Sequence, residues 1–304
     1  MTLEQLRIFV AVAEREHVTR AAADLNLTQS ATSAAVSALE ARYATKLFDR
    51  VGRRIALTDA GRTFLAEAKA VLARAASAEL VLADLAGLKV GSLRLAASQT
   101  VGNYWLPGII HAFRSAYPGL AVDMTMGNTE TVAAMVRKGE ANIGFVEGEV
   151  DAHALGVMPV ADDDMALVVA PSHPWATAKN GKALDLRSSP WVMREHGSGT
   201  RSILEAMLAA QGHGLSDVSI SLVLPTNESV RVAVESGAGA TVMSRLVVSN
   251  ALKAGRLVAV GYPVPRRKFF MLRHSQHHET AAEREFVRLV IESRTPENQC
   301  GRRR

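Results

Sequence analysis

The segment Arg194–Arg201, REHGSGTR, carries a dense set of anion-binding groups. Its two glycines can expose consecutive backbone N–H groups, its serine and threonine add hydroxyl donors, and its two arginines supply positive charge. The residues of this segment that we predict to contact a bound effector are Arg194, Glu195, Gly197, Ser198, Thr200 and Arg201. A predicted helix over 200–211 follows, and the dipole at its start also favours an anion. The alternative is a glycine-rich helix cap whose arginines form surface ion pairs.

Small polar side chains also follow other predicted strands. They are Ser98, Gln99, Thr100, Asn128, Thr129 and Glu147 in the first half of the α/β region, and Asn227 and Glu228 in the second. Ligands of open α/β sheets bind at the carboxyl ends of strands, beside helix N-termini. These positions therefore predict one effector-binding cleft, in which a small oxyanion lies between two helix starts.

Nothing in the sequence indicates catalysis or a metal site. The segment HGSGT lacks the G-x-S-x-G frame, and no His and Asp are placed to activate Ser198. The histidines His274, His277 and His278 lack a carboxylate or cysteine at a fixed ligand spacing, which favours a solvated loop. We expect no enzyme activity, no metal and no cofactor, only a small bound effector.

The segments Val18–Leu27 and Thr28–Glu40 predict two helices joined by a tight turn at Asn26, the layout of a helix-turn-helix. The second helix begins with small hydrogen-bonding side chains, at the end of a recognition helix that reaches base edges. The residues predicted to contact DNA here are Thr28, Gln29, Ser30, Thr32 and Ser33. The alternative is an ordinary amphipathic helix pair with a Ser/Thr-rich exposed face.

The segment Leu47–Gly61, LFDRVGRRIALTDAG, adds a basic hairpin to this pair of helices. Gly52 permits a turn, and Ile55–Leu57 reads as a short strand. Arg53 and Arg54 would then contact phosphates beside the recognition helix. Together these segments predict a winged helix-turn-helix over residues 1–58.

A long helix should follow at 59–90, because the segment has no proline and keeps apolar residues on one helical face. A small winged domain cannot bury that stripe alone. We expect the helix to pair with its counterpart in a second subunit, since helix-turn-helix proteins bind two half-sites through a two-fold axis. The alternative is packing on the following domain of the same chain.

From residue 91 onward the pattern alternates between strands and helices, which predicts largely parallel sheets covered by helices on both faces. The predicted strands are Ser92–Ala97, Leu120–Met126, Ala141–Glu147, Met165–Ala170, Trp191–Arg194, Val218–Val223, Ala240–Met243, Leu257–Val260 and Lys268–Arg273. The predicted helices are Trp105–Tyr117, Thr129–Lys138, Thr200–Gln211, Ser229–Ser236, Leu246–Ala254 and Ala281–Ser293. This number of units implies two lobes, with crossings near Asp162–Asp164 and Pro263–Pro265.

Composition supports a globular protein but says little about DNA. The 304 residues are 48% hydrophobic, with a net charge of +5. Ten Lys and Arg against five Asp and Glu lie in residues 263–304, so the rest of the chain is formally neutral and the global charge is a weak argument. The single cysteine, the lack of a signal peptide and the lack of a long apolar run favour the cytoplasm and disfavour secretion and membrane spanning.

The order of these motifs resembles that of the LysR-type transcriptional regulators: LRIF, TRAAADL, TQSATSAAVSALE, LFDR, a basic wing and LTDAG. The departures are Ser30 and Ala34, where the family often has Pro and Arg, and Ala44, where a glycine usually ends the recognition helix. The strings REHGSGTR and SQTVGNYWLP resemble a subgroup that includes regulators of sulfur assimilation and carbon fixation.

This resemblance implies a linker helix and a two-lobed effector domain of the type 2 periplasmic-binding-protein kind over 91–304. Lobe I would hold 91–161 and 266–304, and lobe II 162–265. The implied effector is a small anion, such as an inorganic sulfur oxyanion or a phosphorylated or carboxylated metabolite. The implied partners are double-stranded promoter DNA, RNA polymerase and further copies of the chain in a homodimer or homotetramer.

Two other classes of protein use the same two-lobed scaffold. A solute-binding protein is disfavoured by the helix-turn-helix and the missing export signal. An enzyme is disfavoured because no acid, base or nucleophile constellation is present. We therefore predict a DNA-binding regulator controlled by a small effector.

Overall fold

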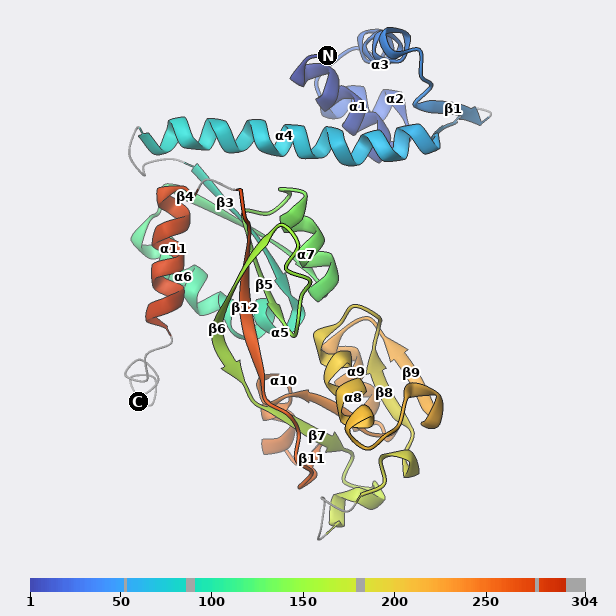
Figure 1. Cartoon of the computed structure of the whole chain (residues 1–304), viewed down its shortest axis with the longest axis vertical. Coiled ribbons are helices and arrows are strands. Elements are labelled where there is room, and N and C mark those ends of the chain that lie inside the picture. Colours follow the sequence, from blue (N-terminus) through green and yellow to red (C-terminus); the bar gives the residue numbers. More distant parts are fainter. Residues whose placement is uncertain (52–53, 86–90, 179–183, 277–278, 294–304) are drawn as a thin grey trace. The chain divides into compact units, whose positions relative to one another are not determined.

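The computed structural model describes residues 1–51, 54–85, 91–178, 184–276 and 279–293. The chain forms two compact units, a helical one that ends at Leu85 and an α/β one that holds the sheets from Gly91 onward. Figure 1 labels their helices and strands. Among the described helices, none is both long enough and apolar enough to cross a membrane.

Three helices open the first unit: α1 (Leu3–Arg15), α2 (Val18–Asp24) and α3 (Gln29–Tyr43). The hydroxyl of Thr28 accepts a hydrogen bond from the amide of Ala31 and so fixes the start of α3. Asn26 takes a left-handed backbone with φ of 54°, which makes the turn between α2 and α3 tight. Ala44 ends α3 in the same region with φ of 48°, where glycine would carry no steric cost. The predicted helix-turn-helix is confirmed.

A hairpin and a long helix complete this unit. Strands β1 (Phe48–Val51) and β2 (Arg54–Leu57) pair antiparallel, and α4 runs over Asp59–Leu85. The fully buried ring of Phe9 lies 5.4 Å from the ring of Phe48 and 4.8 Å from that of Phe64, measured between centroids. These contacts join α1, the hairpin and the first turns of α4 in one core.

Lobe I of the second unit is built on a five-stranded sheet with the order β4-β3-β5-β12-β6 (Figure 1). Its strands are β3 (Gly91–Ser98), β4 (Leu120–Gly127), β5 (Ile143–Glu147), β6 (Leu155–Asp163) and β12 (Arg267–His274). Its helices are α5 (Gln99–Tyr104), α6 (Leu106–Ala116), α7 (Thr129–Arg137) and α11 (Ala281–Glu292). Phe113, Phe145 and Phe286 are fully buried between the sheet and α6 and α11, and the ring of Phe286 contacts those of the other two.

Lobe II holds two smaller sheets. Strands β7 (Met165–Val169), β10 (Thr241–Ser244) and β11 (Val258–Ala259) are antiparallel, while β8 (Trp191–Arg194) and β9 (Ile220–Leu224) are parallel. A bridge between Trp191 and Ala240 connects the two sheets. The helices are α8 (Gly199–Ala210), α9 (Asn227–Glu235) and α10 (Arg245–Lys253), with short 3-10 turns at Pro174–Thr177, Leu186–Ser188 and Leu215–Asp217. The chain passes from lobe I to lobe II between β6 and β7 and returns between β11 and β12.

Three details of the predicted α/β region were wrong. The sheets are mixed, because β12 returns from lobe II and pairs antiparallel with both β5 and β6. Strand β6 was not predicted, although it supplies one edge of the sheet in lobe I. Helix α5 was not predicted either, whereas the predicted helix over Trp105–Tyr117 is confirmed as α6, with Pro107 in its first turn.

Candidate DNA-binding and effector sites

The first turns of α3 present polar groups to solvent. Thr28, Gln29 and Ser30 are exposed, and Ser33 is half-buried. The hydroxyls of Thr28 and Ser30 lie 3.1 Å apart, and Thr28 also caps the helix, so these two side chains are held in place. Gln29 and Ser33 form no side-chain hydrogen bond with the described part of the chain, which leaves their polar groups open to a partner.

Thr32 does not belong to this surface. Its side chain is 0% exposed, and its hydroxyl donates to the carbonyl oxygen of Thr28 at 3.1 Å. Thr32 lies seven residues before the buried Leu39, which places both on the core face of the helix. The predicted base contact of Thr32 is therefore wrong, because the helical phase buries it.

The predicted phosphate contacts of the wing are not settled by the structure. Arg53 lies outside the described residues. The backbone of Arg54 pairs with that of Val51 at the start of β2, but its side chain is outside the described part of the chain. Both remain predictions.

Glu40, near the end of α3, is a positioning residue that the sequence analysis missed. Its nearly buried carboxylate accepts from the backbone amides of Leu47 at 2.8 Å and Phe48 at 3.2 Å, and from Lys46 Nζ at 2.9 Å. Burial by itself would raise the pKa of Glu40, but these hydrogen bonds outweigh it and lower the pKa. The carboxylate thus ties the recognition helix to the first strand of the hairpin.

Glu40→Gln should lower the free energy of unfolding of the helix-turn-helix unit by about 1–2 kcal/mol at neutral pH, because charge-assisted hydrogen bonds become neutral ones. Since the folded pKa lies below the unfolded value, the wild-type advantage is present above about pH 4.5 and is lost as the pH falls through the folded pKa. Urea denaturation at several pH values measures this, with Glu67→Gln on the exposed side of α4 as control. Equal effects of both substitutions would contradict the assignment.

In lobe I, three of the predicted effector residues contact Glu147, whose buried carboxylate lies at the end of β5. It accepts hydrogen bonds from the hydroxyls of Ser98 and Thr100, the latter at 2.9 Å, and both hydroxyls are buried. Thr129 donates to the backbone carbonyl of Glu147 at 2.8 Å. Burial raises the pKa of Glu147, and the nearby Arg267 and Thr100 only partly offset this.

In lobe II, the buried guanidinium of Arg194 organises the site. It forms a two-point ion pair with Glu195 at 2.7 and 2.8 Å and donates to the side-chain oxygen of Asn227 at 2.5 Å. Burial would raise the pKa of Glu195, but its hydrogen bonds and ion pair with Arg194 lower it. Asn227 in turn donates to Thr100 of lobe I at 3.0 Å.

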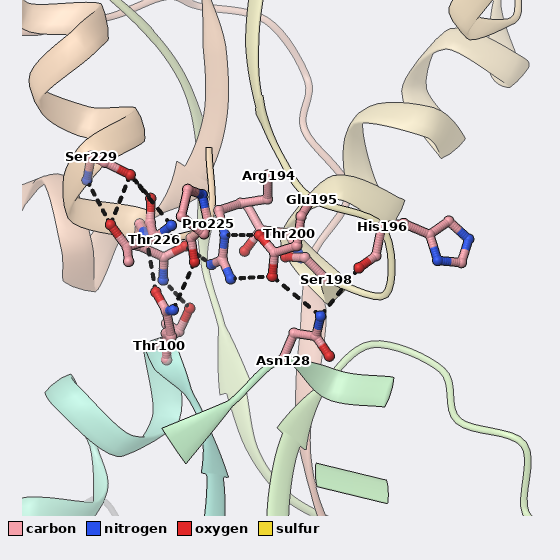
Figure 2. Close-up of polar contacts among 12 residues, drawn as sticks. Thr100, Asn128, Arg194, Glu195, His196, Ser198, Thr200, Pro225, Thr226 and Ser229 are labelled. Carbon is pink, nitrogen blue, oxygen red and sulfur yellow. Dashed lines mark hydrogen bonds and ion pairs between the residues drawn. The ribbon is translucent and has the colours of Figure 1, made fainter. Parts of the chain in front are cut away.

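The two lobes also touch at the rims of the cleft. Figure 2 shows Asn128 of lobe I reaching lobe II, where it donates to Glu195 at 3.2 Å and to the carbonyl of His196 at 3.1 Å. Gln99 binds the backbone of Pro225 and Asn227 from the other side. Tyr104 donates to Glu228 at 2.9 Å, and burial together with this carboxylate raises the tyrosine pKa to about 12.

The residues of the segment Arg194–Arg201 differ in what they contact. Ser198 caps α8 and accepts from the amide of Thr200 at 3.3 Å, and both are buried. A side chain at Gly199 would collide with the carbonyl of Glu147, so only glycine permits this approach of the lobes. The carbonyl of Gly197 accepts from the amide of Glu130 at 3.2 Å. Arg201 instead pairs with Glu205 along α8 at 2.7 Å.

A second buried cation, Arg267 at the start of β12, was missed by the sequence analysis. Its guanidinium bonds Asp163 at 2.7 Å, Thr200 at 3.2 Å and Thr100 at 3.3 Å, and it lies 3.7 Å from Glu147. Asp163 also accepts from Ser244 at 2.5 Å. The only sequence signal was an arginine just after the second crossing and an aspartate in the first. Arg267 therefore joins both predicted halves of the cleft.

A winged helix-turn-helix followed by a two-lobed domain with buried polar and cationic groups between its lobes defines a DNA-binding regulator with an effector-binding domain. The family model for the bacterial regulatory helix-turn-helix protein, lysR family, matches residues 3–62, and the model for the LysR substrate binding domain matches residues 86–294. The chain belongs to the LysR family of transcriptional regulators.

Three relatives illustrate the similarity. The chain is 34% identical over 290 residues to the HTH-type transcriptional regulator YeiE of Escherichia coli (strain K12), covering 94% of this chain and 96% of that protein. It is 32% identical over 295 residues to the RuBisCO operon transcriptional regulator of Allochromatium vinosum, covering 94% and 95%. The fold matches that of full-length CbnR complexed with its target DNA, with a TM-score of 0.71, 22% identity and coverage of 96% and 100%.

Proposed function

We propose that the protein controls transcription in the cytoplasm by placing α3 in the major groove of promoter DNA, where Gln29, Ser30 and Ser33 read base edges. Gln29 and Ser30 are exposed, and the half-buried Ser33 forms no side-chain hydrogen bond with the described part of the chain, which supports this role. Thr28 would position the helix start, and Arg53 and Arg54 would contact the phosphates beside it. A homodimer or homotetramer built through α4 would present two or more such helices to adjacent half-sites and to RNA polymerase.

The effector that we propose is a small oxyanion held between the lobes. One observation carries this proposal: a buried network joins the hydroxyls of Ser98, Thr100 and Thr200 to the guanidinium of Arg267 and, through Asn227, to that of Arg194. Hydroxyl donors and forked guanidinium groups are the usual recognition groups of sulfur oxyanions, phosphates and carboxylates.

In the structure, the carboxylate of Glu147 already accepts hydrogen bonds from two of these donors, the hydroxyls of Ser98 and Thr100. An incoming oxyanion must therefore compete with an internal anion for Ser98 and Thr100. Binding becomes easier when Glu147 is protonated or when its side chain turns away, because two like charges cannot share one buried site. The effector would favour one arrangement of the lobes and thereby reset the spacing of the DNA-binding helices.

Gln29→Ala should reduce discrimination between the preferred operator and variants with one changed base pair by about 1–3 kcal/mol, the value of a two-point base contact. Operator selection followed by fluorescence anisotropy across a salt series measures it. Thr32→Ser is the matched control, because it keeps the buried hydroxyl that bonds Thr28 and should leave the preferred operator unchanged. Uniform weakening on all DNA sequences in Gln29→Ala would overturn base reading by this residue.

A further inference from the structure

A cavity of about 740 Å³ lies beside the two crossings between the lobes. Residues of lobe I line one side, among them Trp105 and Lys268, and Arg245 and Leu246 at the start of α10 line the other. Asp163, which bonds Ser244 and Arg267, also lines this cavity. The cavity is the size of a small-molecule site, and neither the DNA-binding role nor the proposed oxyanion uses it.

Some of the charged side chains around this cavity form ion pairs and others do not. Asp163 is neutralised by Arg267, and Asp164 pairs with Arg266 at 3.2 Å. Among the described residues, the side chains of Arg245, Lys268 and Asp162 form no ion pair, although all three line the cavity. Two cations and one carboxylate without an ion pair therefore line the same cavity, a combination that suits a zwitterionic ligand.

Apolar surface lies next to these charges. The indole of Trp105 packs against Phe269 with a centroid distance of 5.7 Å, and Leu246 is 40% exposed. Both Trp105 and Leu246 line the cavity. A flat or branched apolar group could therefore be covered from lobe I by the indole and from lobe II by the leucine.

We propose that this cavity is a second ligand site that takes a small amphiphilic carboxylate of the amino-acid type. Arg245 and Lys268 bind its carboxylate, Asp162 accepts a hydrogen bond from its ammonium or hydroxyl group, and Trp105 with Leu246 covers its apolar body. Because the lining comes from both lobes beside their crossings, a ligand here stabilises one arrangement of the lobes from outside the oxyanion cleft.

Isothermal titration of the full chain with L-phenylalanine tests the site, with phenethylamine as a probe that lacks the carboxylate. Wild-type protein should bind L-phenylalanine at or below about 1 mM, an affinity typical of a small polar ligand, and phenethylamine should not bind. Arg245→Ala should weaken L-phenylalanine about tenfold, as expected for loss of a charge-assisted contact. Lys253→Ala, which removes an exposed cation from the other end of α10, is the matched control and should bind normally.

A further variant separates this cavity from the oxyanion cleft. Ser98→Ala should leave L-phenylalanine binding unchanged, because Ser98 lies in the cleft and does not line the cavity. The proposal is overturned if wild-type protein gives no binding heat, if phenethylamine binds equally well, or if Arg245→Ala behaves like Lys253→Ala. Loss of binding in Ser98→Ala alone would place the ligand in the cleft and also overturn it.

Discussion

Glu147→Gln should bind sulfate more tightly than the wild-type protein at neutral pH. Two unit charges about 4 Å apart repel by up to about 4 kcal/mol at the effective dielectric of a protein site, and Arg194 and Arg267 screen part of this repulsion. We therefore expect roughly tenfold to hundredfold tighter binding when the carboxylate is replaced by a neutral amide. The glutamine oxygen can still accept from Ser98 or Thr100, so the site keeps its shape. Isothermal titration with sulfate measures the change.

The same substitution should remove a pH dependence. Burial raises the pKa of Glu147, so lowering the pH protonates the internal anion and sulfate should bind more tightly to the wild-type protein. Because the folded pKa lies above the unfolded value near 4.5, this carboxyl also destabilises the folded domain as the pH rises from that value through the raised pKa. Glu147→Gln should show neither effect.

The matched control is Glu149→Gln, an exposed carboxylate two residues further along the chain. It changes the net charge by the same amount and should leave both the affinity and its pH dependence unchanged. If Glu149→Gln matches Glu147→Gln, the gain comes from net charge alone. Weaker sulfate binding in Glu147→Gln would show that the carboxylate supports the anion site and does not compete for it.

Arg267→Met should cause the largest loss of stability in the effector domain. The arginine side chain is 2% exposed and pairs with Asp163 and Glu147, so its removal leaves two buried carboxylates without their main cation. Removing one partner of a buried ion pair lowers the free energy of unfolding by about 3–5 kcal/mol. For a domain of this size the midpoint of thermal unfolding should fall by about 10 °C. Calorimetry of the full chain measures it.

The neighbouring residue supplies a control for this prediction. Arg266 has an 82% exposed side chain that pairs with Asp164 at the surface, so Arg266→Met should change stability by less than about 0.5 kcal/mol. Arg267→Lys should recover only part of the loss, because an ammonium group cannot bond the aspartate and both threonines with fixed, forked geometry. Equal midpoints for Arg266→Met and Arg267→Met would show that the buried network contributes nothing to folding.

The lobes close on each other through groups that the sequence could not place together. Ser98, Thr100, Glu147, Arg194 and Asn227 were each predicted from their position after a strand or before a helix. The sequence could not show that Glu147 takes the hydrogen bonds of Ser98 and Thr100, because those residues lie 47 to 49 positions away. The hydrogen-bond donors of the proposed oxyanion site, which the sequence alone would leave open, are therefore partly occupied by the chain's own carboxylate.

The helix-turn-helix, the long helix and most α/β elements could be predicted because their signals are local: a threonine cap, an asparagine turn and apolar residues at helical or strand spacing. The burial of Thr32 depends on how α3 is rotated against α1, and the site of Arg267 depends on β12 returning between β5 and β6. Helix phase and strand register are set by packing between segments distant in the chain, so only the tertiary structure decided which of the predicted polar groups are exposed, which are buried and which bond each other.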